Sequence, residues 1–293
     1  MMDKPASWTA IRVCQGRAVA DRRFAVGQFS DPIAAQLLRG SERTLVDHTL
    51  AAAAPSEWRN RLEYEMLTAT AAVMAARTVV IDNAVDERGN QQLAILGAGL
   101  DARAWRMASL SEVDVFEIDH PASQQDKRNR IGTLQSVAKS VTYVPVDFGR
   151  DSLGPALAAA GHTDTLPTTW IWEGVMPYLT QAQVQTTLAA VAERSAIGSR
   201  LIATYPVPNR FARARHLTIT LFSWFSTGRE RRATEPQRSA WTPNIMHDLL
   251  AAHGFTVTAD HELAAVAEQL AIPVHRSRFS DLGRVAVADR LED

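Results

Sequence analysis

The stretch Gln92–Arg106, Gln-Leu-Ala-Ile-Leu-Gly-Ala-Gly-Leu-Asp-Ala-Arg-Ala-Trp-Arg, is the part of the chain around which the rest is organised. The four apolar residues Leu93–Leu96 follow one another without period-2 alternation, which is typical of a short strand buried on both faces. Gly97-Ala98-Gly99 then predicts a tight turn into a helix, because glycine lets a ligand approach the backbone amides at a helix amino terminus. The pattern predicts the strand–loop–helix unit of a nucleotide-binding α/β fold.

A second apolar run, Val113–Asp119, ends in an acid about twenty residues after the glycines. At the tip of the neighbouring strand, Asp119 would hold a ribose through its hydroxyls. Two cofactors fit, because Gly97-x-Gly99-x-x-Ala102 also satisfies the dinucleotide fingerprint. Asp101, which we expect in the first turn of the helix, favours S-adenosylmethionine, since a carboxylate there would repel a pyrophosphate and S-adenosylmethionine carries none.

Composition sets further bounds on the function. The chain has 293 residues, 46% hydrophobic and 22% charged, which suits a soluble globular protein. Its 31 basic and 32 acidic residues give a net charge of -1, which argues against nucleic acid or an anionic membrane as a partner. The single cysteine, Cys14, excludes an internal disulfide and a cysteine-based metal cluster. With no signal-peptide core and no long uninterrupted apolar run, we expect a cytoplasmic protein.

The first ninety residues lack strand alternation and are rich in alanine, which predicts a helical cap over residues 1–90. The expected helices are Thr9–Val26, Asp31–Leu38 and Glu57–Ile81. Most arginines in this cap are expected at the surface. Arg77 differs, because its neighbours are mostly apolar and a lone arginine there needs an anionic partner.

From residue 91 the pattern alternates strands with helices, which is typical of a mostly parallel sheet. Seven strands are expected, at Leu93–Leu96, Val113–Ile118, Val141–Val146, Thr169–Trp172, Arg200–Thr204, Phe255–Thr258 and Arg284–Ala288. The expected helices are Ser123–Val137, Leu153–Ala160, Gln181–Ser195 and Pro243–Ala252. Ligands of such sheets bind at the carboxyl ends of the strands, where this chain has Gly97, Asp119, Asp147, Glu173 and Tyr205.

The domain organisation follows from these patterns. We expect one domain over 1–293, with a cofactor-binding core at 91–205 and completion of the sheet at 243–293. Residues 206–242 are arginine-rich and aromatic, and they predict either a lid insertion or a solvated basic helix. The eight histidines show no metal-ligand spacing, and neither a Gly-x-Ser-x-Gly elbow nor a P-loop occurs.

Several motifs together resemble one known family. They are Leu96–Arg103, Phe116–Pro121 with Lys127-Arg128, Val146–Phe148 and Trp172–Leu179. This combination resembles the leucine carboxyl methyltransferase family, and it is most similar to the bacterial branch of S-adenosylmethionine-dependent O-methyltransferases. The opening segments Gly16–Ala18 and Ser30–Ala34 are similar to that branch as well. The resemblance implies a class I, Rossmann-like methyltransferase fold with S-adenosyl-L-methionine as cofactor.

The resemblance also implies which residues form the site. The family's glycine-loop contact falls on Gly97, with Gly99 beside it, and its ribose acid falls on Asp119. Its adenine pair falls on Asp147 and Phe148, where Phe148 replaces the usual leucine. The family's glutamate near the methionine end of the cofactor falls on Glu173. Its arginine that pairs with the methionine carboxylate falls on Arg77, and Arg17 is a weaker match.

Methyl transfer from a sulfonium is an in-line displacement, so the enzyme mainly positions the acceptor. A carboxylate acceptor is already ionised at pH 7, whereas a hydroxyl needs a base, for which Tyr178, Tyr205 and His216 are candidates. We expect an O-methyltransferase acting on a carboxylate or hydroxyl of a small molecule. The alternatives are a protein carboxyl-terminal methyltransferase, an NAD-dependent oxidoreductase and a non-catalytic S-adenosylmethionine-binding protein. The oligomeric state stays open.

Overall fold

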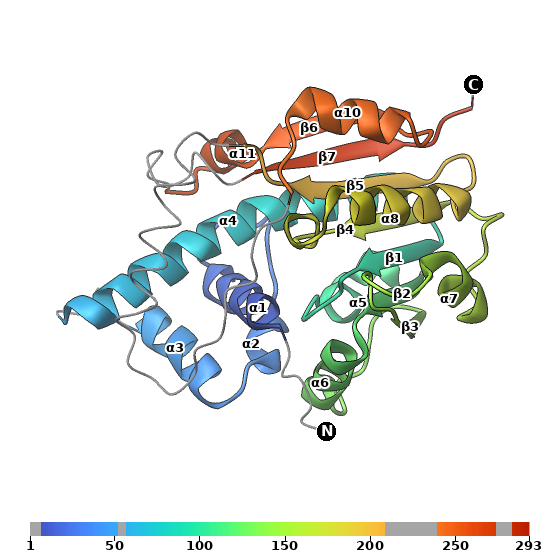
Figure 1. The fold of residues 1–293 in the computed structure, drawn as a ribbon. Coiled ribbons are helices and arrows are strands. Elements are labelled where there is room, and N and C mark those ends of the chain that lie inside the picture. The colour runs from blue at the N-terminus through green and yellow to red at the C-terminus, as the bar shows by residue number, and fades with distance from the viewer. Residues whose placement is uncertain (1–6, 52–56, 209–238, 274–282, 293) are drawn as a thin grey trace.

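A seven-stranded sheet forms the centre of the protein (Figure 1). The structure, a computed structural model, describes residues 7–51, 57–208, 239–273 and 283–292. The strands are β1 Gln92–Leu96, β2 Asp114–Asp119, β3 Ser140–Pro145, β4 Thr168–Trp172, β5 Arg200–Tyr205, β6 Thr256–Glu262 and β7 Arg284–Asp289. Their order is β3-β2-β1-β4-β5-β7-β6. Strands β1 to β5 pair in parallel and β7 is antiparallel to both neighbours, which confirms the predicted mostly parallel sheet.

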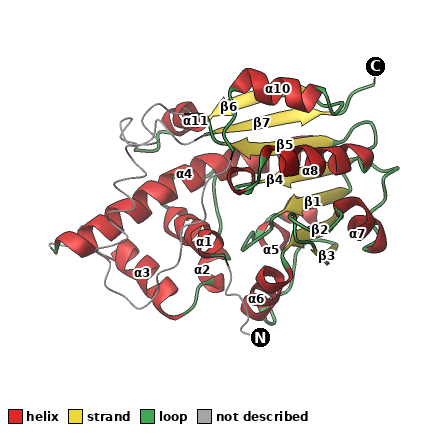
Figure 2. Ribbon diagram, viewed as in Figure 1, coloured by secondary structure: helices red, strands yellow, loops and turns green. Residues whose placement is uncertain are grey.

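Helices cover both faces of the sheet (Figure 2). One hydrophobic cluster contains side chains of α7 (Leu153–Ala159), α8 (Gln181–Glu193) and α10 (Pro243–Ala251). The other contains side chains of α1 (Trp8–Ala20), α4 (Trp58–Arg88), α5 (Arg103–Arg106), α6 (Pro121–Ile131) and α11 (Leu263–Gln269). In β1, Leu93 and Ile95 join the second cluster while Ala94 and Leu96 join the first. Burial on both faces explains why this strand is an unbroken apolar run.

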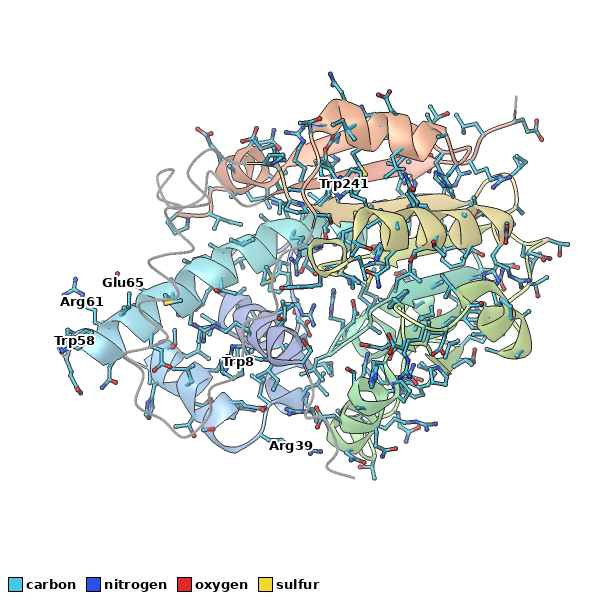
Figure 3. The ribbon with its side chains drawn as sticks, in the orientation of Figure 1. Trp8, Arg39, Trp58, Arg61, Glu65 and Trp241 are labelled. Carbon is cyan, nitrogen blue, oxygen red and sulfur yellow. The ribbon has the colours of Figure 1, made fainter. Side chains whose placement is uncertain are left out.

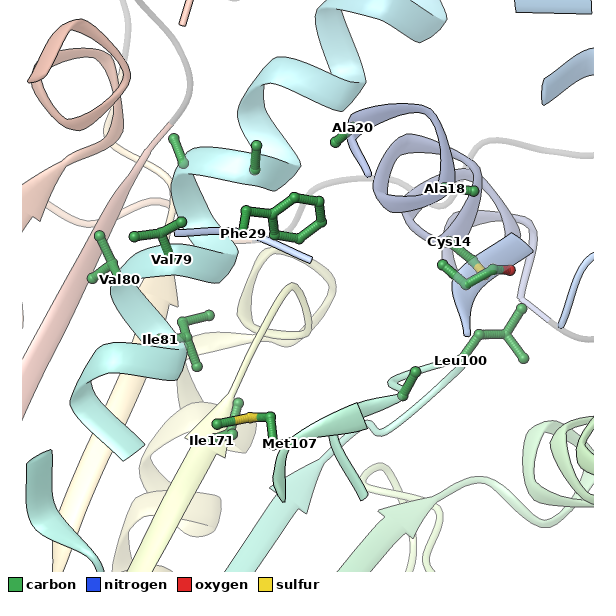
Figure 4. Close-up of a cluster of buried hydrophobic side chains, with 14 of the residues drawn as sticks. Cys14, Ala18, Ala20, Phe29, Val79, Val80, Ile81, Leu100, Met107 and Ile171 are labelled. Carbon is green, nitrogen blue, oxygen red and sulfur yellow. The ribbon is translucent and has the colours of Figure 1, made fainter. Parts of the chain in front are cut away.

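The amino-terminal helices share the second cluster with the sheet. Figure 4 shows Val79 of α4 beside Phe29, and below them Ile81, Met107 and the β4 side chain Ile171; Ala18 of α1 belongs to the same cluster. Helix α1 approaches α4 closely at Gly16, where a Cβ would lie 2.9 Å from Cγ of Met74 and from Cγ2 of Thr70. Helices α2 (Ala34–Leu37) and α3 (Gly40–Ala51) complete this layer. The helical layer is therefore packed onto the sheet by a continuous apolar interior.

Several predicted helix boundaries were wrong, and one of them is the end of α4, which lies at Arg88 and not at Ile81. Helix α1 ends at Ala20, because the Asp21 carboxylate turns back to accept the Asp31 N–H at 2.9 Å. Only one turn, α2, follows the predicted start at Asp31. The predicted helix over 123–137 ends at Ile131, where Gly132 has φ +56°. In addition, α3 was not predicted, because its sequence is polar and only Val46 and Thr49 are buried.

Helix α4 is long and partly exposed. The segment Asn60–Arg88 is long enough to cross a membrane, and its most apolar 18-residue window has a mean hydropathy of 1.2, so it qualifies by length and composition only. More than half of the most apolar window, 56%, is buried inside the protein, as in the core helix of a soluble fold. Its outer end carries Trp58, 59% exposed, and the ion pair Arg61–Glu65 at 3.2 Å (Figure 3).

The two ends of the predicted lid lie beside each other after β5. The Trp241 N–H donates to the Pro206 carbonyl at 2.9 Å, and the Ser239 hydroxyl donates to the Met176 carbonyl at 2.8 Å. Met176 belongs to the short helix η2 (Met176–Tyr178), which follows β4. Most of the predicted lid, residues 209–238, lies outside the described residues, and His216 with it.

Candidate cofactor site

A cavity of about 330 Å³ opens at the carboxyl ends of β1, β2 and β4. This volume lies within the range of about 300–1,000 Å³ that is usual for small-molecule sites. Its walls come from α1, the glycine loop, the start of α6 and the loop after β4. Of the predicted site residues, the cavity is lined by Arg17, Arg77, Gly97, Gly99, Asp119, Phe148, Glu173 and Tyr178.

The glycine loop has a backbone that other residues adopt only with strain. Gly97 has φ +70°, and its N–H donates to the Ile118 carbonyl at 2.7 Å, which holds the loop against β2. A Cβ at Gly97 would lie 2.2 Å from Cγ2 of Val175. Gly99 has φ +48°, and a Cβ there would lie 3.0 Å from Cβ of Ala10 in α1. Both glycines are therefore required for the turn and for close packing around the cavity.

Asp119 receives two backbone hydrogen bonds at the end of β2. Its Oδ2 accepts the Gly99 N–H at 2.6 Å and its Oδ1 accepts the His120 N–H at 2.6 Å. Burial raises the pKa of Asp119, and the two amides act against this shift. Each carboxylate oxygen keeps a second lone pair, so the side chain can also accept hydrogen bonds from a diol in the cavity.

Arg77 of α4 pairs with Glu173, the residue after β4. Arg77 Nη2 lies 2.6 Å from Glu173 Oε1, and the two side chains are 12% and 8% exposed. The sequence predicted an anionic partner for Arg77, and in the structure this partner is the Glu173 carboxylate. Burial opposes ionisation of Glu173, but Arg77, Arg103 and Arg17 outweigh it and hold the pKa of Glu173 far below its usual value. The end of the cavity beside this pair therefore presents one positive and one negative group.

Arg17 supports the glycine loop from α1. Its side chain is buried, Nη2 donates to the Leu100 carbonyl at 2.7 Å, and Nε lies 3.1 Å from Asp31 Oδ2. The expected surface role of this arginine was therefore wrong, and the weaker predicted match does lie at the cavity. Ala10 and Val13 line the same wall at helical spacing from Arg17. That periodicity in the sequence is the signal that would have found this face of α1.

Asp101 lies outside the helix in which it was predicted. Helix α5 begins at Arg103, and Asp101 Oδ1 accepts the Arg103 N–H at 2.8 Å. Its Oδ2 pairs with the Arg103 guanidinium. Burial opposes the charge of Asp101, but Arg103 and Arg17 outweigh it and lower its pKa. Asp101 still lines the cavity, so its negative charge lies near the ligand and disfavours a pyrophosphate there.

Of the two residues predicted to contact the adenine, one lines the cavity and the other does not. Phe148 lines the cavity, whereas Asp147 is not among the described residues that do. The Asp147 carboxylate accepts the Gly149 N–H at 2.9 Å, and the Asp147 N–H donates to Asp151 at 2.8 Å. Asp147 is therefore engaged in its own turn, a local use of acids that is common after strands.

The three base candidates lie in different places. Tyr178 lines the cavity. Tyr205 is 2% exposed, its hydroxyl donates to Asp260 Oδ2 at 2.6 Å, and burial raises its pKa far above the usual value. It is not among the described lining residues, and His216 lies outside the described chain. His120 also lines the cavity, but its Nδ1 accepts the Ala122 N–H at 3.2 Å.

Comparison with protein families identifies the chain's relatives. A family model described as leucine carboxyl methyltransferase matches residues 10–192. A protein of Mycolicibacterium paratuberculosis is 32% identical over 278 residues, which cover 88% of this chain and 87% of that protein. One of Frankia alni is 34% identical over 210 residues, 69% and 71% of the two chains. One of Streptomyces coelicolor is 39% identical over 138 residues, which span 48% of its length. Each bears the name "Putative S-adenosyl-L-methionine-dependent methyltransferase".

Solved structures share the fold. A protein of Thermobifida fusca, described as a "putative methyltransferase", aligns with a TM-score of 0.58 over 99% of this chain and 97% of its own. A DUF574-family protein of Streptomyces avermitilis aligns with a TM-score of 0.57 over 97% and 98%. Both are 14% identical to this chain, so the likeness is one of fold. The two solved structures therefore share the overall fold of this chain.

Proposed function

Because the chain belongs to the leucine carboxyl methyltransferase family of S-adenosylmethionine-dependent methyltransferases, we propose that it transfers the methyl group to an oxygen of a small molecule. The acceptor oxygen belongs to a carboxylate or a hydroxyl. The cytoplasmic location and the absence of nucleic-acid and membrane partners, expected from the sequence, remain predictions. The four-part division of the chain into cap, core, lid and completion of the sheet is likewise proposed.

The cavity suits the parts of S-adenosylmethionine. Asp119 has lone pairs for the ribose hydroxyls, and the glycine loop allows close approach of the cofactor. Arg77 and Glu173 carry the charges opposite to the carboxylate and ammonium of the methionine end. Phe148 offers an aromatic face to the adenine. The sulfonium methyl would then point to an acceptor held behind it, in line with the bond that breaks.

One observation favours a carboxylate acceptor over a hydroxyl. Each carboxylate that lines the cavity in the described part of the chain is already engaged. Asp101 and Glu173 pair with arginines, and Asp119 accepts two amide N–H groups. None of the three is free to remove a proton, and a carboxylate acceptor has none to lose at neutral pH. A hydroxyl acceptor would need a base, for which Tyr178 in the cavity and His216, outside the described residues, are the candidates, and this is the second reading.

The test is a methylation assay with a panel of small carboxylic acids, phenols and alcohols. Mass spectrometry detects the methylated product and S-adenosylhomocysteine together. Mild base then cleaves a methyl ester and leaves a methyl ether intact. For a carboxylate acceptor the rate should be flat from about pH 6 to 9, because the acceptor is ionised throughout. A rate that rises over this range, and that Tyr178→Phe abolishes, would favour the hydroxyl reading.

The rival functions give other outcomes in the same assay. Methylation of peptides with a free carboxyl terminus, but of no small molecule, would identify a protein carboxyl-terminal methyltransferase. Binding of NAD without binding of S-adenosylmethionine would identify an oxidoreductase. Tight S-adenosylmethionine binding with no product from any acceptor class would favour a non-catalytic binding protein.

A further inference from the structure

A buried cluster of charges extends from the cavity into the protein. It contains four arginines and four carboxylates, Arg17, Arg77, Arg103, Arg106, Asp31, Asp82, Asp101 and Glu173. Every one of these side chains is at most 15% exposed, and the formal charges cancel. Buried charges persist only where they are paired, so removing one member affects its neighbours.

Arg103 lies at the centre of this cluster and joins three parts of the chain. Its Nε lies 2.7 Å from Asp82 of α4, and its Nη1 lies 2.9 Å from Glu173 after β4. Nη1 also pairs with Asp101 of the glycine loop. The side chain is 1% exposed and is not among the described residues that line the cavity. Two of its three partners, Asp101 and Glu173, do line it.

The geometry of the contacts requires a guanidinium. A planar fork can direct N–H groups at several carboxylates at once, whereas a lysine ammonium is a single point charge on a flexible stem. Without the fork, Glu173 would keep only Arg77 as a direct partner, and Asp101 would lose its guanidinium partner and keep only the Arg103 N–H. Each carboxylate could then turn away from the cavity or take up a proton.

We propose that Arg103 is a positioning residue that sets the affinity for the amino-acid end of the cofactor by fixing Glu173 and Asp101. This inference rests on the proposed function, since it takes S-adenosylmethionine as the ligand of the cavity. Arg103 touches no cofactor atom. It acts through the two carboxylates, and its effect is confined to the end of the cavity where they lie.

The chain offers a matched control in Arg106. It also lies on α5, its side chain is 6% exposed, and its Nη1 lies 2.7 Å from the same Asp82. Its other acidic neighbour is Asp31, at 3.6 Å. Neither Asp82 nor Asp31 is among the described lining residues. A purely structural role for these arginines would therefore make Arg103→Lys and Arg106→Lys alike.

The experiment compares two ligands by calorimetry on the full chain. S-adenosylhomocysteine has the amino-acid end, and 5′-methylthioadenosine keeps the adenine, ribose and sulfur but lacks that end. Arg103→Lys should raise the Kd of S-adenosylhomocysteine about tenfold or more and leave that of methylthioadenosine within about twofold. Arg106→Lys should leave both within about twofold. In a Glu173→Gln background, Arg103→Lys should weaken S-adenosylhomocysteine much less than in the wild type.

Two results overturn the proposal: an equal loss for Arg103→Lys and Arg106→Lys, or an equal loss for the two ligands in Arg103→Lys. Should Arg103→Lys not fold, Asp82→Asn replaces it, because this change loosens Arg103 from α4 and alters no lining side chain. Asp82→Asn should weaken S-adenosylhomocysteine alone, and unchanged affinity for it also overturns the proposal. A wild-type protein that binds neither ligand would instead contradict the proposed function.

Discussion

Arg77 Nη2 and Glu173 Oε1 lie 2.6 Å apart. Through this ion pair, helix α4 of the amino-terminal layer forms part of the wall of the cavity at the carboxyl ends of the strands. The pair joins α4, which precedes the strand–helix repeat, to the loop that follows β4. The pair offers a positive group to the carboxylate and a negative group to the ammonium of a ligand that carries both. The proposed cofactor carries both groups at its methionine end.

Arg77→Lys should raise the Kd of S-adenosylmethionine. If the guanidinium binds the methionine carboxylate in a bidentate manner, lysine cannot replace it well, and loss of one charge-assisted hydrogen bond costs about 1.5–3 kcal/mol. The Kd should therefore rise by about tenfold or more. Calorimetry measures this change, and circular dichroism verifies that the fold is intact. Decarboxylated S-adenosylmethionine should show little difference between wild type and variant. A loss of thermal stability with unchanged affinity would make Arg77 a structural partner of Glu173 only.

Asp119→Ala should weaken cofactor binding by about tenfold or more, because two charge-assisted hydrogen bonds to the ribose are lost. Asp114→Ala is the control, since Asp114 lies at the start of the same strand and pairs with Lys139 at 2.8 Å and Ser140 at 2.7 Å. The control should leave the Kd of S-adenosylhomocysteine unchanged in equilibrium dialysis. Similar losses in both variants would contradict the role assigned to Asp119.

Gly97→Ala should abolish cofactor binding and destabilise the protein. The added Cβ meets Val175 at 2.2 Å, and φ +70° is strained for alanine. The control is Gly89→Ala, where the backbone is left-handed at φ +62° and a Cβ would meet only the Asp86 carbonyl oxygen, at an ordinary distance of 3.9 Å. The control should therefore lose about 1 kcal/mol of unfolding free energy, from strain alone, and keep its affinity for S-adenosylhomocysteine. Chemical denaturation and calorimetry measure the two quantities. Equal behaviour of the two variants would show that the contact with Val175 is unimportant.

We expect the free energy of unfolding to fall in acid because of the buried ring of His162. The ring is 3% exposed and packs near Phe116 and Trp170, at centroid distances of 5.3 and 5.2 Å. Burial, together with Arg194, lowers the pKa of His162 to about 4. Between about pH 6.5 and pH 4 the unfolded chain therefore binds a proton that the folded chain does not, so stability falls as pH falls.

The predicted loss from His162 is about 1–2 kcal/mol between pH 7 and pH 5. Urea unfolding of wild type and His162→Gln at both pH values measures it, because only the wild type has this group. The difference in unfolding free energy between the two proteins should narrow as pH falls. A constant difference would place the His162 pKa near its ordinary value.

The sequence predicted the sheet better than the helices. The apolar run of β1 was recognisable because burial on both faces removes polar residues from the sequence itself. Helix α3 was not, because most of its side chains face solvent and only Val46 and Thr49 are buried. Asp31-Pro32 was predicted as a helix start, and Asp31 Oδ1 does accept the Ala34 N–H at 3.0 Å, but its other oxygen also pairs with the buried Arg17. Tertiary ion pairs of this kind leave no local pattern.

In the site too, residues that belong to local sequence patterns were predicted, and residues that depend on tertiary contacts were not. Gly97, Gly99 and Asp119 followed from local motifs because the strand ends fix where their groups point. Asp147 obeyed the same strand-end rule, but its carboxylate is engaged in its own turn. The role of Arg103 could not be predicted, because its partners Asp82 and Glu173 are far from it in sequence and meet only in the folded chain.

The described lining of the cavity runs from Ser7 to Tyr178, and strands β5, β6 and β7 contribute nothing to that part of it. The family model spans nearly the same region, residues 10–192. On the proposed function, substitutions in the described residues after β5 therefore change no side chain that lines the cofactor cavity, so the acceptor specificity can be altered there without altering that lining.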